Sequence, residues 1–368
     1  MALAMALAAG ACGDVDDTSG GPSGSPDRST TTSVPSSTTT PAVDYTTPGE
    51  PESLGNGLVE AASADGSALY VLDEDPAFAQ PGCEGQPEPV LFRVPVEGGK
   101  RVRLGSAGEA VSGRLVQGPG QQVAVVDECE EFLQEIRVGT ETLDGRLEDL
   151  RIVPLETGEA ATLLQPRVTA WNAAGDALLA GALNPSGGNG MVAGIDPVTG
   201  AVTPLFDTGS GSTGGPSQVA QLADGSYVVT DGGQVTLRSA SGEVTGRTAG
   251  AGFTLFADGA RVAAFGTTLT VLAPGSPPTT LVPVQPDRSI DLAAASPNGA
   301  VVAFSYRIGE KSFINLIDVE RPAIRVVESG AGLGRPVFSG DGRALVFSRF
   351  DRTEPFGTEV LVARFAKG

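Results

Sequence analysis

The sequence predicts an all-β protein, a seven-bladed β-propeller of four-stranded antiparallel blades preceded by a disordered tether. Three observations carry this prediction. Glycine provides 51 of the 368 residues, about twice its usual share, which indicates many turns. A short phrase of small residues, Asp or Asn, and glycine recurs seven times, at intervals of about 35 to 55 residues that are typical of propellers. A run of apolar residues follows each copy.

The recurring phrase predicts the turn between the first and second strands of each blade. Asp-Gly and Asn-Gly between apolar runs are strong hairpin signals, because such turns need a positive φ that these residues tolerate. The best copies are the first, sixth and seventh, and the second copy has lost the acidic residue. The glycines of the seven copies are Gly66, Gly120, Gly175, Gly225, Gly259, Gly299 and Gly342.

The residues after each glycine predict a central strand that is covered on both sides. The third and fifth positions are mostly apolar, as in Val302 and Phe304, and so are the residues between them. A strand that is apolar on both faces is packed between two sheets. The same register places Trp171, which precedes the third turn, in the core rather than on a sugar-binding surface.

The last repeat supplies only three strands, near residues 335–339, 343–350 and 358–365. A closed ring needs a fourth strand, and propellers often take it from the opposite terminus, which removes an exposed edge. The segment Ala42 to Thr46 is the candidate, and its weak strand pattern predicts an imperfect closure. Two stacked β-sandwich domains are the alternative architecture, which the even spacing of the repeats disfavours.

The repeated phrase resembles a known family of propellers. Ser-x-Asp-Gly-x-x-Leu/Val after an aromatic residue, as in Phe338-Ser339-Gly340-Asp341-Gly342, is similar to the TolB-like, WD-repeat-like repeats of secreted bacterial proteins. The resemblance extends from about Asn56 to the end of the sequence. In that family the phrase is a structural turn, so the resemblance implies a fold and transfers no activity.

The first residues resemble a targeting segment. Residues 1–11 are Met, Ala, Leu and Gly, too short a stretch to span a bilayer as a helix. With Cys12 they resemble a bacterial lipobox, although Ala9 departs from the pattern. The resemblance implies that Cys12 is lipidated and that the protein is extracytoplasmic, anchored to the outer leaflet of the cytoplasmic membrane. Residues 12–55 are then a disordered Ser/Thr/Pro-rich linker and residues 56–368 the propeller. A plain signal peptide is the alternative.

Two further cysteines predict a disulfide. Cys83 and Cys129 fall at corresponding places in neighbouring repeats, each in the loop after the central strand, and equivalent loops emerge on the same face. An oxidising envelope favours their pairing. A reactive cysteine is the competing interpretation, and no histidine exists to activate one.

The same two loops are rich in carboxylates. Hard cations take several carboxylate and carbonyl oxygens, so a Ca²⁺ site is one interpretation, and a solvated acidic rim is the other. The acids do not follow an EF-hand spacing, and no other cofactor is indicated. The candidate ligands are Asp73, Glu74, Asp75, Asp127, Glu128 and Glu130.

Basic and aromatic residues gather in loops of the sixth and seventh repeats, on the face opposite the glycine turns. Aromatic and Arg side chains are enriched at interaction hot spots, so these loops predict a partner-binding surface, with ordinary loop residues as the alternative. The candidates are Tyr306, Arg307, Lys311, Arg349, Phe350, Arg352 and Phe356.

Composition restricts the function further. The chain has no histidine, which excludes Ser-His-Asp and Cys-His hydrolases and any His-ligated metal. Its net charge of −20 disfavours nucleic acid as a partner. We therefore expect a monomeric binding or scaffold propeller that recognises a protein or a cell-wall component. The alternative is a Ca²⁺-dependent lactonase-type or lyase-type propeller whose carboxylates converge in the central channel.

Overall fold

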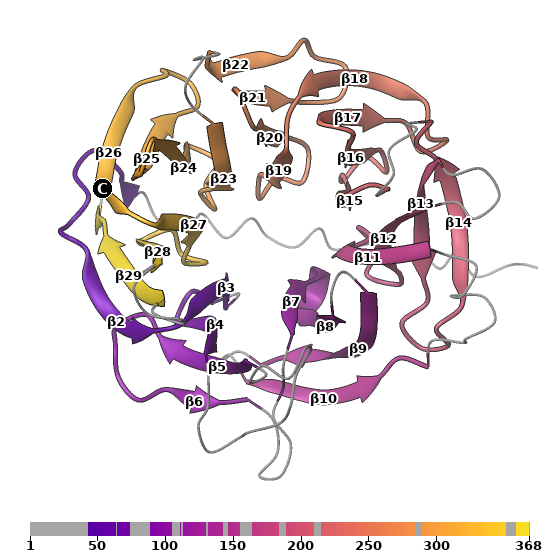
Figure 1. Cartoon of the computed structure of the whole chain (residues 1–368), viewed down its shortest axis with the longest axis horizontal. Coiled ribbons are helices and arrows are strands. Elements are labelled where there is room, and N and C mark those ends of the chain that lie inside the picture. Colours follow the sequence, from indigo (N-terminus) through magenta and orange to yellow (C-terminus); the bar gives the residue numbers. More distant parts are fainter. Residues whose placement is uncertain are drawn as a thin grey trace, which may run out of the picture. The chain divides into compact units, whose positions relative to one another are not determined.

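Seven four-stranded antiparallel sheets follow one another around a ring, as the repeats predict (Figure 1). The protein is described from a computed structural model. It covers residues 43–63, 65–73, 89–104, 111, 113–129, 132–142, 146–154, 164–183, 189–209, 215–283, 289–350 and 358–367. The all-β, seven-bladed propeller predicted from the sequence is therefore confirmed.

Each of the first six blades is built from four consecutive strands, numbered outward from the centre of the ring. Blades 1 to 3 contain β3 (Leu58–Ala62), β4 (Ala68–Asp73), β5 (Val90–Pro95) and β6 (Val102–Arg103); β7 (Arg114–Gln117), β8 (Gln122–Cys129), β9 (Phe132–Glu141) and β10 (Leu147–Ile152); β11 (Leu164–Trp171), β12 (Leu178–Leu183), β13 (Gly190–Ile195) and β14 (Val202–Asp207). Blades 4 to 6 contain β15 (Gln218–Gln221), β16 (Tyr227–Asp231), β17 (Gln234–Arg238) and β18 (Val244–Ala249); β19 (Gly252–Leu255), β20 (Val262–Phe265), β21 (Leu269–Leu272) and β22 (Thr279–Val282); β23 (Ser289–Ala295), β24 (Val301–Ile308), β25 (Lys311–Asp318) and β26 (Ile324–Ala331).

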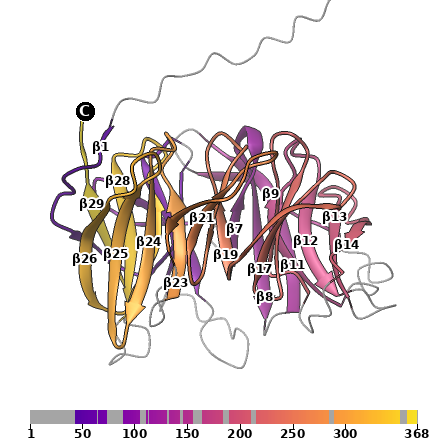
Figure 2. The same cartoon turned by 90° about the horizontal axis from the view of Figure 1, so that it is seen from above.

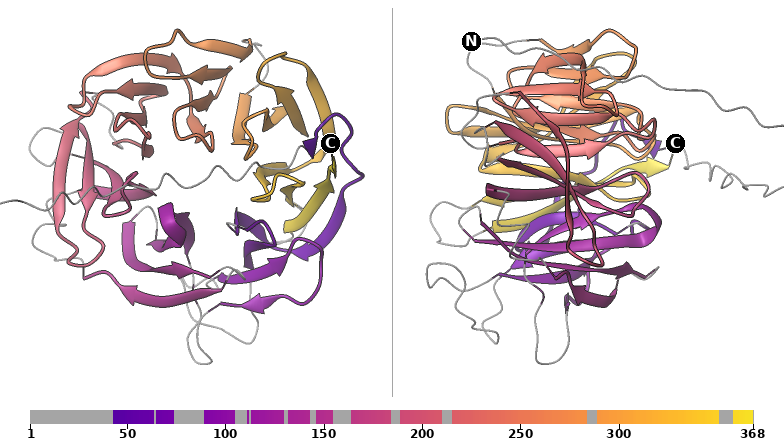
Figure 3. Two further views of the ribbon diagram at one scale, coloured as in Figure 1. Left: turned by 180° about the vertical axis from the view of Figure 1, so that it is seen from behind. Right: turned by 90° about the vertical axis from the view of Figure 1, so that its right-hand side faces the viewer.

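The seventh blade is closed by a strand from the beginning of the described chain. Its inner strands are β27 (Leu333–Phe338), β28 (Ala344–Phe350) and β29 (Thr358–Arg364), and β2 (Glu52–Asn56) pairs antiparallel with β29 (Figures 1 and 3). The closing strand is thus Glu52–Asn56, and the prediction of Ala42 to Thr46 was wrong. The assignment of residues 43–55 to a disordered linker was wrong as well, because β2 is part of the seventh blade. Val43 and Asp44 instead form β1 (Val43–Asp44), which pairs with β30 (Ala366–Lys367).

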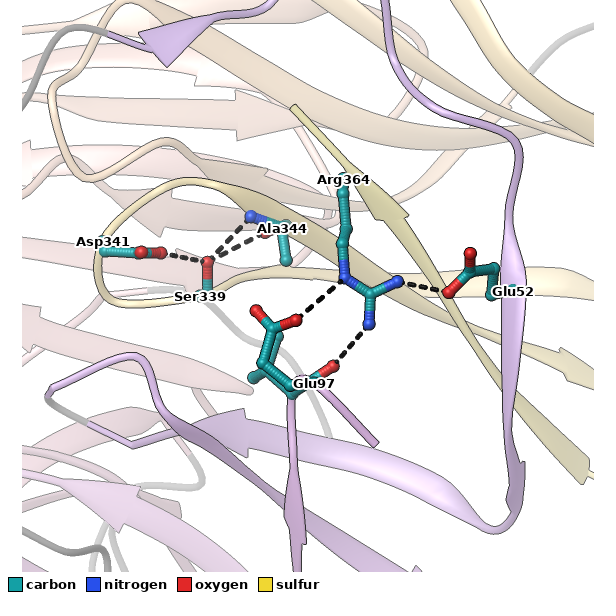
Figure 4. A network of polar contacts seen from close by, with 7 residues as sticks. Glu52, Glu97, Ser339, Asp341, Ala344 and Arg364 are labelled. Carbon is teal, nitrogen blue, oxygen red and sulfur yellow. Dashed lines mark hydrogen bonds and ion pairs between the residues drawn. The ribbon is translucent and has the colours of Figure 1, made fainter. Parts of the chain in front are cut away.

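One arginine joins the closing strand to the next blade. Arg364 at the end of β29 forms ion pairs with Glu52 of β2 and with Glu97 of blade 1, the latter at 3.7 Å (Figure 4). Its second guanidinium nitrogen donates to the carbonyl of Val96 at 2.9 Å. Blades 7 and 1 are therefore held to the same side chain at the point where the ring closes.

The predicted turns connect the first and second strands of every blade. In six blades the glycine has a positive φ and its N–H donates to the carbonyl three residues earlier, as from Gly342 to Ser339 at 2.8 Å. In blades 1, 6 and 7 the buried serine that opens the phrase also acts as a cap. The Ser339 hydroxyl donates to Asp341 at 2.7 Å and accepts the Ala344 N–H at 2.9 Å (Figure 4).

The apolar core lies between the sheets. Each central strand has side chains on both faces, and each face packs on a neighbouring blade. Between blades 6 and 7, for example, Ala303 and Ile314 pack with Leu345 and Phe347. Trp171 is buried between blades 2 and 3, where its indole N–H donates to the carbonyl of Val116 at 3.2 Å, so its predicted core position is confirmed.

The described chain begins on the face that carries the glycine turns, which we call the turn face. Tyr45 is buried there, with its ring edge-on to Phe365 at 5.0 Å and to Phe338 at 5.9 Å. Figure 2 shows β1 and the C-terminus at the same side of the ring. The opposite face, which carries the connections from second to third strands, is called the loop face. In the parts of the chain that are described, no helix has the length and apolar character needed to cross a membrane.

The turn serines provide a direct test of this architecture. Replacing Ser339 by Ala leaves the Ala344 N–H buried without its acceptor, which should lower the free energy of unfolding by about 1 to 3 kcal/mol. Ser276→Ala, at an exposed loop position, is the matched control and should change stability by less than about 0.5 kcal/mol. Denaturant unfolding measures both variants, and equal stabilities would contradict the capping role.

Candidate partner-binding face

The structure brings the described part of the predicted basic and aromatic group to the loop face. Tyr306 and Arg307 lie near the end of β24, Lys311 begins β25, and Arg349 and Phe350 end β28 of the neighbouring blade. These strand ends lie opposite the turn face. The other two predicted residues, Arg352 and Phe356, lie outside the described residues.

A groove of about 270 Å³ separates blades 6 and 7 on this face. Arg307 and Phe350 line it from the two blades, and both side chains are exposed, Phe350 to 40%. Within the described residues Arg307 forms no ion pair, so its guanidinium is available to a partner. The remaining lining residues are Asp291, Leu292, Ser305, Ser312, Gly332, Leu333 and Gly334.

Gly332 is required for the shape of this groove. It has a φ of +69°, and a Cβ atom there would lie 2.2 Å from the carbonyl oxygen of Phe350. Its own carbonyl accepts the Phe350 N–H at 2.9 Å. A larger residue would move the strand end that presents Phe350, so the connection between blades positions the aromatic side chain.

The other predicted residues have different surroundings. Tyr306 stacks on Phe313 with ring centroids 4.8 Å apart. The Lys311 ammonium lies over the Phe313 ring, 5.2 Å from its centroid. This stack is on the side of blade 6 that faces blade 5. Arg349 pairs across strands with Glu359 at 3.2 Å, which partly neutralises its charge. The groove residues and the stack are therefore two separate features.

Sequence reasoning missed Asp291, Ser305 and Gly332, which complete the groove. The first two lie on strands of blade 6, and Gly332 lies in the connection to blade 7. None carries a motif, because their role depends only on how two blades meet. The glycine-rich run from Gly330 to Gly334 was the one available signal of a close backbone approach.

The predicted calcium site and disulfide stay predictions. Asp73 forms an ion pair with Arg101 at 2.7 Å, and Asp127 lies half-buried on β8. Glu74, Asp75, Glu130 and Cys83 fall outside the described residues, as do the side chains of Glu128 and Cys129. Across the described ranges, no group of three or more Cys, Asp or Glu side chains is arranged to hold a metal ion.

The innermost strands carry one buried carboxylate next to arginines. Glu60 on β3 is paired with Arg335, which comes from β27 of the neighbouring blade, and Arg114 on β7 adds a further positive charge. Burial raises the pKa of Glu60 above its ordinary value, and the two arginines partly oppose the shift. Arg335 has a φ of +50°, a strained backbone for a residue other than glycine. This pair joins blades 7 and 1.

Comparison with known proteins supports the fold alone. No family model matches the sequence, and no curated protein matches it. A solved prolyl endopeptidase is similar over 86% of this chain, with a TM-score of 0.53 and 13% identity, and this chain spans 51% of it. The β-propeller domain of Cps50 (Swd1) from Myceliophteria thermophila is similar over 83% of this chain and 96% of that domain, with a TM-score of 0.52 and 12% identity.

The Glu60–Arg335 pair predicts a pH-dependent defect. Arg335→Ala should lower the free energy of unfolding by about 1 to 3 kcal/mol at pH 7. Breaking a fully buried ion pair would lower it more, but Arg335 is partly exposed. The folded state raises the pKa of Glu60, so it binds a proton more tightly than the unfolded chain does. The free energy of unfolding therefore falls as the pH rises through the pKa that Glu60 has in the folded protein. The fall is larger in Arg335→Ala, which lacks the opposing positive charge.

The measurement is denaturant unfolding of both proteins at pH 4 and pH 7. The difference in the free energy of unfolding between Arg335→Ala and the unchanged protein should be smaller at pH 4, where Glu60 is largely protonated, than at pH 7. Adding Glu60→Gln to the variant should recover most of the loss at pH 7. A pH-independent difference, or no recovery in the double variant, would show that the charge of Glu60 is not the cause.

Proposed function

We propose that this protein is an extracytoplasmic binding propeller, anchored to the membrane through Cys12, that recognises a protein partner in the groove between blades 6 and 7. The groove itself is the observation that carries the proposal. It combines an exposed Arg307 without an ion pair among the described residues and an exposed Phe350 on opposite walls of a cavity of about 270 Å³. Arg and aromatic side chains at the centre of a concave surface are typical of interaction hot spots.

The attachment of the chain supports this choice of face. Tyr45 fixes the start of the described chain on the turn face, against Phe338 and Phe365. A tether that leads to Tyr45 enters the propeller there. The groove lies on the opposite face of the ring, so the attachment of the chain at Tyr45 does not cover it.

The side chains favour a protein over a cell-wall glycan. Sugar-binding surfaces commonly use an exposed tryptophan as a platform, and the single tryptophan of the chain, Trp171, is buried. The groove instead offers Arg307 and Asp291, two charges of opposite sign, beside apolar Phe350 and Leu292. A segment of a folded protein that presents an acidic side chain next to an apolar one fits these walls.

The envelope location rests on the resemblance of the sequence to TolB-like propeller lipoproteins. In this proposal Cys12 carries the lipid, residues 12–42 form the tether, and a Cys83–Cys129 disulfide closes the chain across blades 1 and 2 in an oxidising compartment. The protein acts as a monomer and needs no cofactor. The alternative enzyme function would require converging carboxylates, and no described group of side chains favours it.

Partner capture tests the groove. Arg307→Glu and Phe350→Ala should each reduce crosslinking of the envelope partner about tenfold or more, because each removes a hot-spot side chain. The measurement is quantitative crosslinking and co-purification from intact envelopes. Arg321→Glu makes the same charge change at an exposed position of the same blade, on the turn face, and should leave capture unchanged.

Three results would contradict the groove as the site. The first is equal capture by all variants, and the second is a loss with Arg321→Glu alone. The third is capture of peptidoglycan fragments in place of protein. Circular dichroism and melting temperature of each variant show that the fold is retained.

Mass spectrometry tests the proposed location. In protein isolated from envelopes, the N-terminal peptide should begin at an acylated Cys12, and a non-reducing digest should contain a Cys83–Cys129 linked peptide. Cys12→Ser should move the protein from the membrane fraction to the soluble fraction, since the acyl chains are its only proposed anchor. An unmodified Cys12 with free Cys83 and Cys129 would reject this part of the proposal.

A further inference from the structure

A second cavity lies on the other side of blade 6, between blades 5 and 6. Its volume is about 110 Å³. It is separate from the groove, because the two cavities share no lining residue. Its walls are formed by Thr267, Val282, Pro283, Ile290, Phe304, Tyr306, Asn315, Ile324 and Val326.

Asn315 is the unusual member of this lining. Its side chain is fully buried, and neither the amide nitrogen nor the amide oxygen has a hydrogen-bond partner in the described structure. Each unpaired polar atom that is buried in this way costs about 1 to 3 kcal/mol. Buried polar groups are otherwise almost always satisfied, so an unpaired donor and an unpaired acceptor on a residue that lines a cavity suggest a ligand.

The fold does not require an amide at this position. Asn315 lies on the third strand of its blade, directly opposite Phe304, which is the fifth residue after the turn glycine. The residues at the same register position of blades 7, 1, 3 and 4 are Leu361, Phe92, Ala193 and Val235, while blades 2 and 5 have Arg137 and Thr270 there. Four of the six sister blades therefore have an apolar side chain at this place, and none has an amide.

The remaining walls restrict what could fill the cavity. None of the lining residues is charged, so a ligand that carries a full charge would lose its hydration without compensation. Phe304 and Tyr306 supply aromatic surface, with ring centroids 6.1 Å apart. Ile324 and Val326 are 52% and 55% exposed, which places the opening at the outer strand of the blade.

We propose that this cavity binds a compact neutral molecule with a primary amide or lactam group. Such a group presents its N–H and its carbonyl oxygen along one edge, and that edge matches the adjacent donor and acceptor of Asn315. An ordinary trans peptide bond directs the two atoms in opposite directions and could satisfy only one of them. The ring or alkyl part of the ligand packs on Phe304 and Val326.

The size of the cavity agrees with this ligand class. An apolar cavity of about 150 Å³ in another protein accepts benzene, so a cavity of about 110 Å³ encloses only part of a six-membered lactam, and the rest of the ring extends through the open mouth. The inference does not depend on the proposed partner-binding function, because it uses different residues on the other side of the blade.

The test is titration of the full protein with δ-valerolactam and with benzamide, followed by NMR or calorimetry. N-methyl-δ-valerolactam has the same ring and carbonyl without the N–H, and cyclohexanone has neither amide atom. We expect the N-methyl compound and cyclohexanone to bind at least tenfold more weakly than the lactam. This comparison uses the unchanged protein, so it does not depend on the folding of a variant.

Asn315→Leu should reduce lactam binding at least tenfold and should melt no lower than the unchanged protein, because it replaces an unsatisfied amide by the residue used in blade 7. Arg307→Glu, in the groove, should leave lactam binding unchanged. If partner capture fails in that variant while lactam binding persists, the two sites are independent. The inference is overturned by equal binding of the N-methyl compound, by unchanged binding to Asn315→Leu, or by no binding at all, in which case the Asn315 amide is a buried group without a ligand.

Discussion

The ring depends on central strands that are apolar on both faces. Such a strand cannot be stable in a single sheet, because one of its faces would stay in water. Packing a sheet between two neighbouring sheets buries both of its faces. In an open row of sheets the first and last would each keep one face in water, and closing the row into a ring buries those faces too. The strand β2 and Arg364, which join blade 7 to blade 1, are therefore part of the same solution as the apolar core.

The same constraint explains where cavities form. The space between two blades is filled by side chains from both sheets, and it is complete only where those side chains match in size. At the loop-face end of blades 6 and 7, Gly332 and Gly334 contribute no side chains and a groove remains. Between blades 5 and 6, Asn315 lines the cavity with two polar atoms unpaired. Blade 6 borders both sites, which makes it the most informative blade for function.

The two faces of the ring have different constraints. On the turn face the backbone is tightly specified, since the glycines need positive φ and the serine and aspartate side chains cap the N–H groups. Changes there mainly affect stability. On the loop face the strand ends carry side chains that the fold does not use, such as Arg307, so this face can vary in chemistry without loss of the ring.

Much of the fold followed from residues with strong local preferences. The turn glycines and the apolar runs after them placed the first two strands of each blade, because positive φ and two-sided burial leave clear patterns. The closing strand was misplaced because Glu52–Asn56 lies at an outer edge, where half-exposed residues have no hydrophobic period. The candidate site was found only in part: Arg307 and Phe350 stood out by residue type, while Asp291, Ser305 and Gly332 did not.

The sequence by itself determined the number of blades and the face on which each turn lies, because local backbone geometry and strand patterning are properties of neighbouring residues. The tertiary structure alone decided which strand closes the ring and which side chains meet across two blades. It alone also left Arg307 free of an ion pair within the described chain and Asn315 without a hydrogen-bond partner. Those outcomes depend on the packing of segments far apart in the chain, and no local pattern encodes the fit between two sheets.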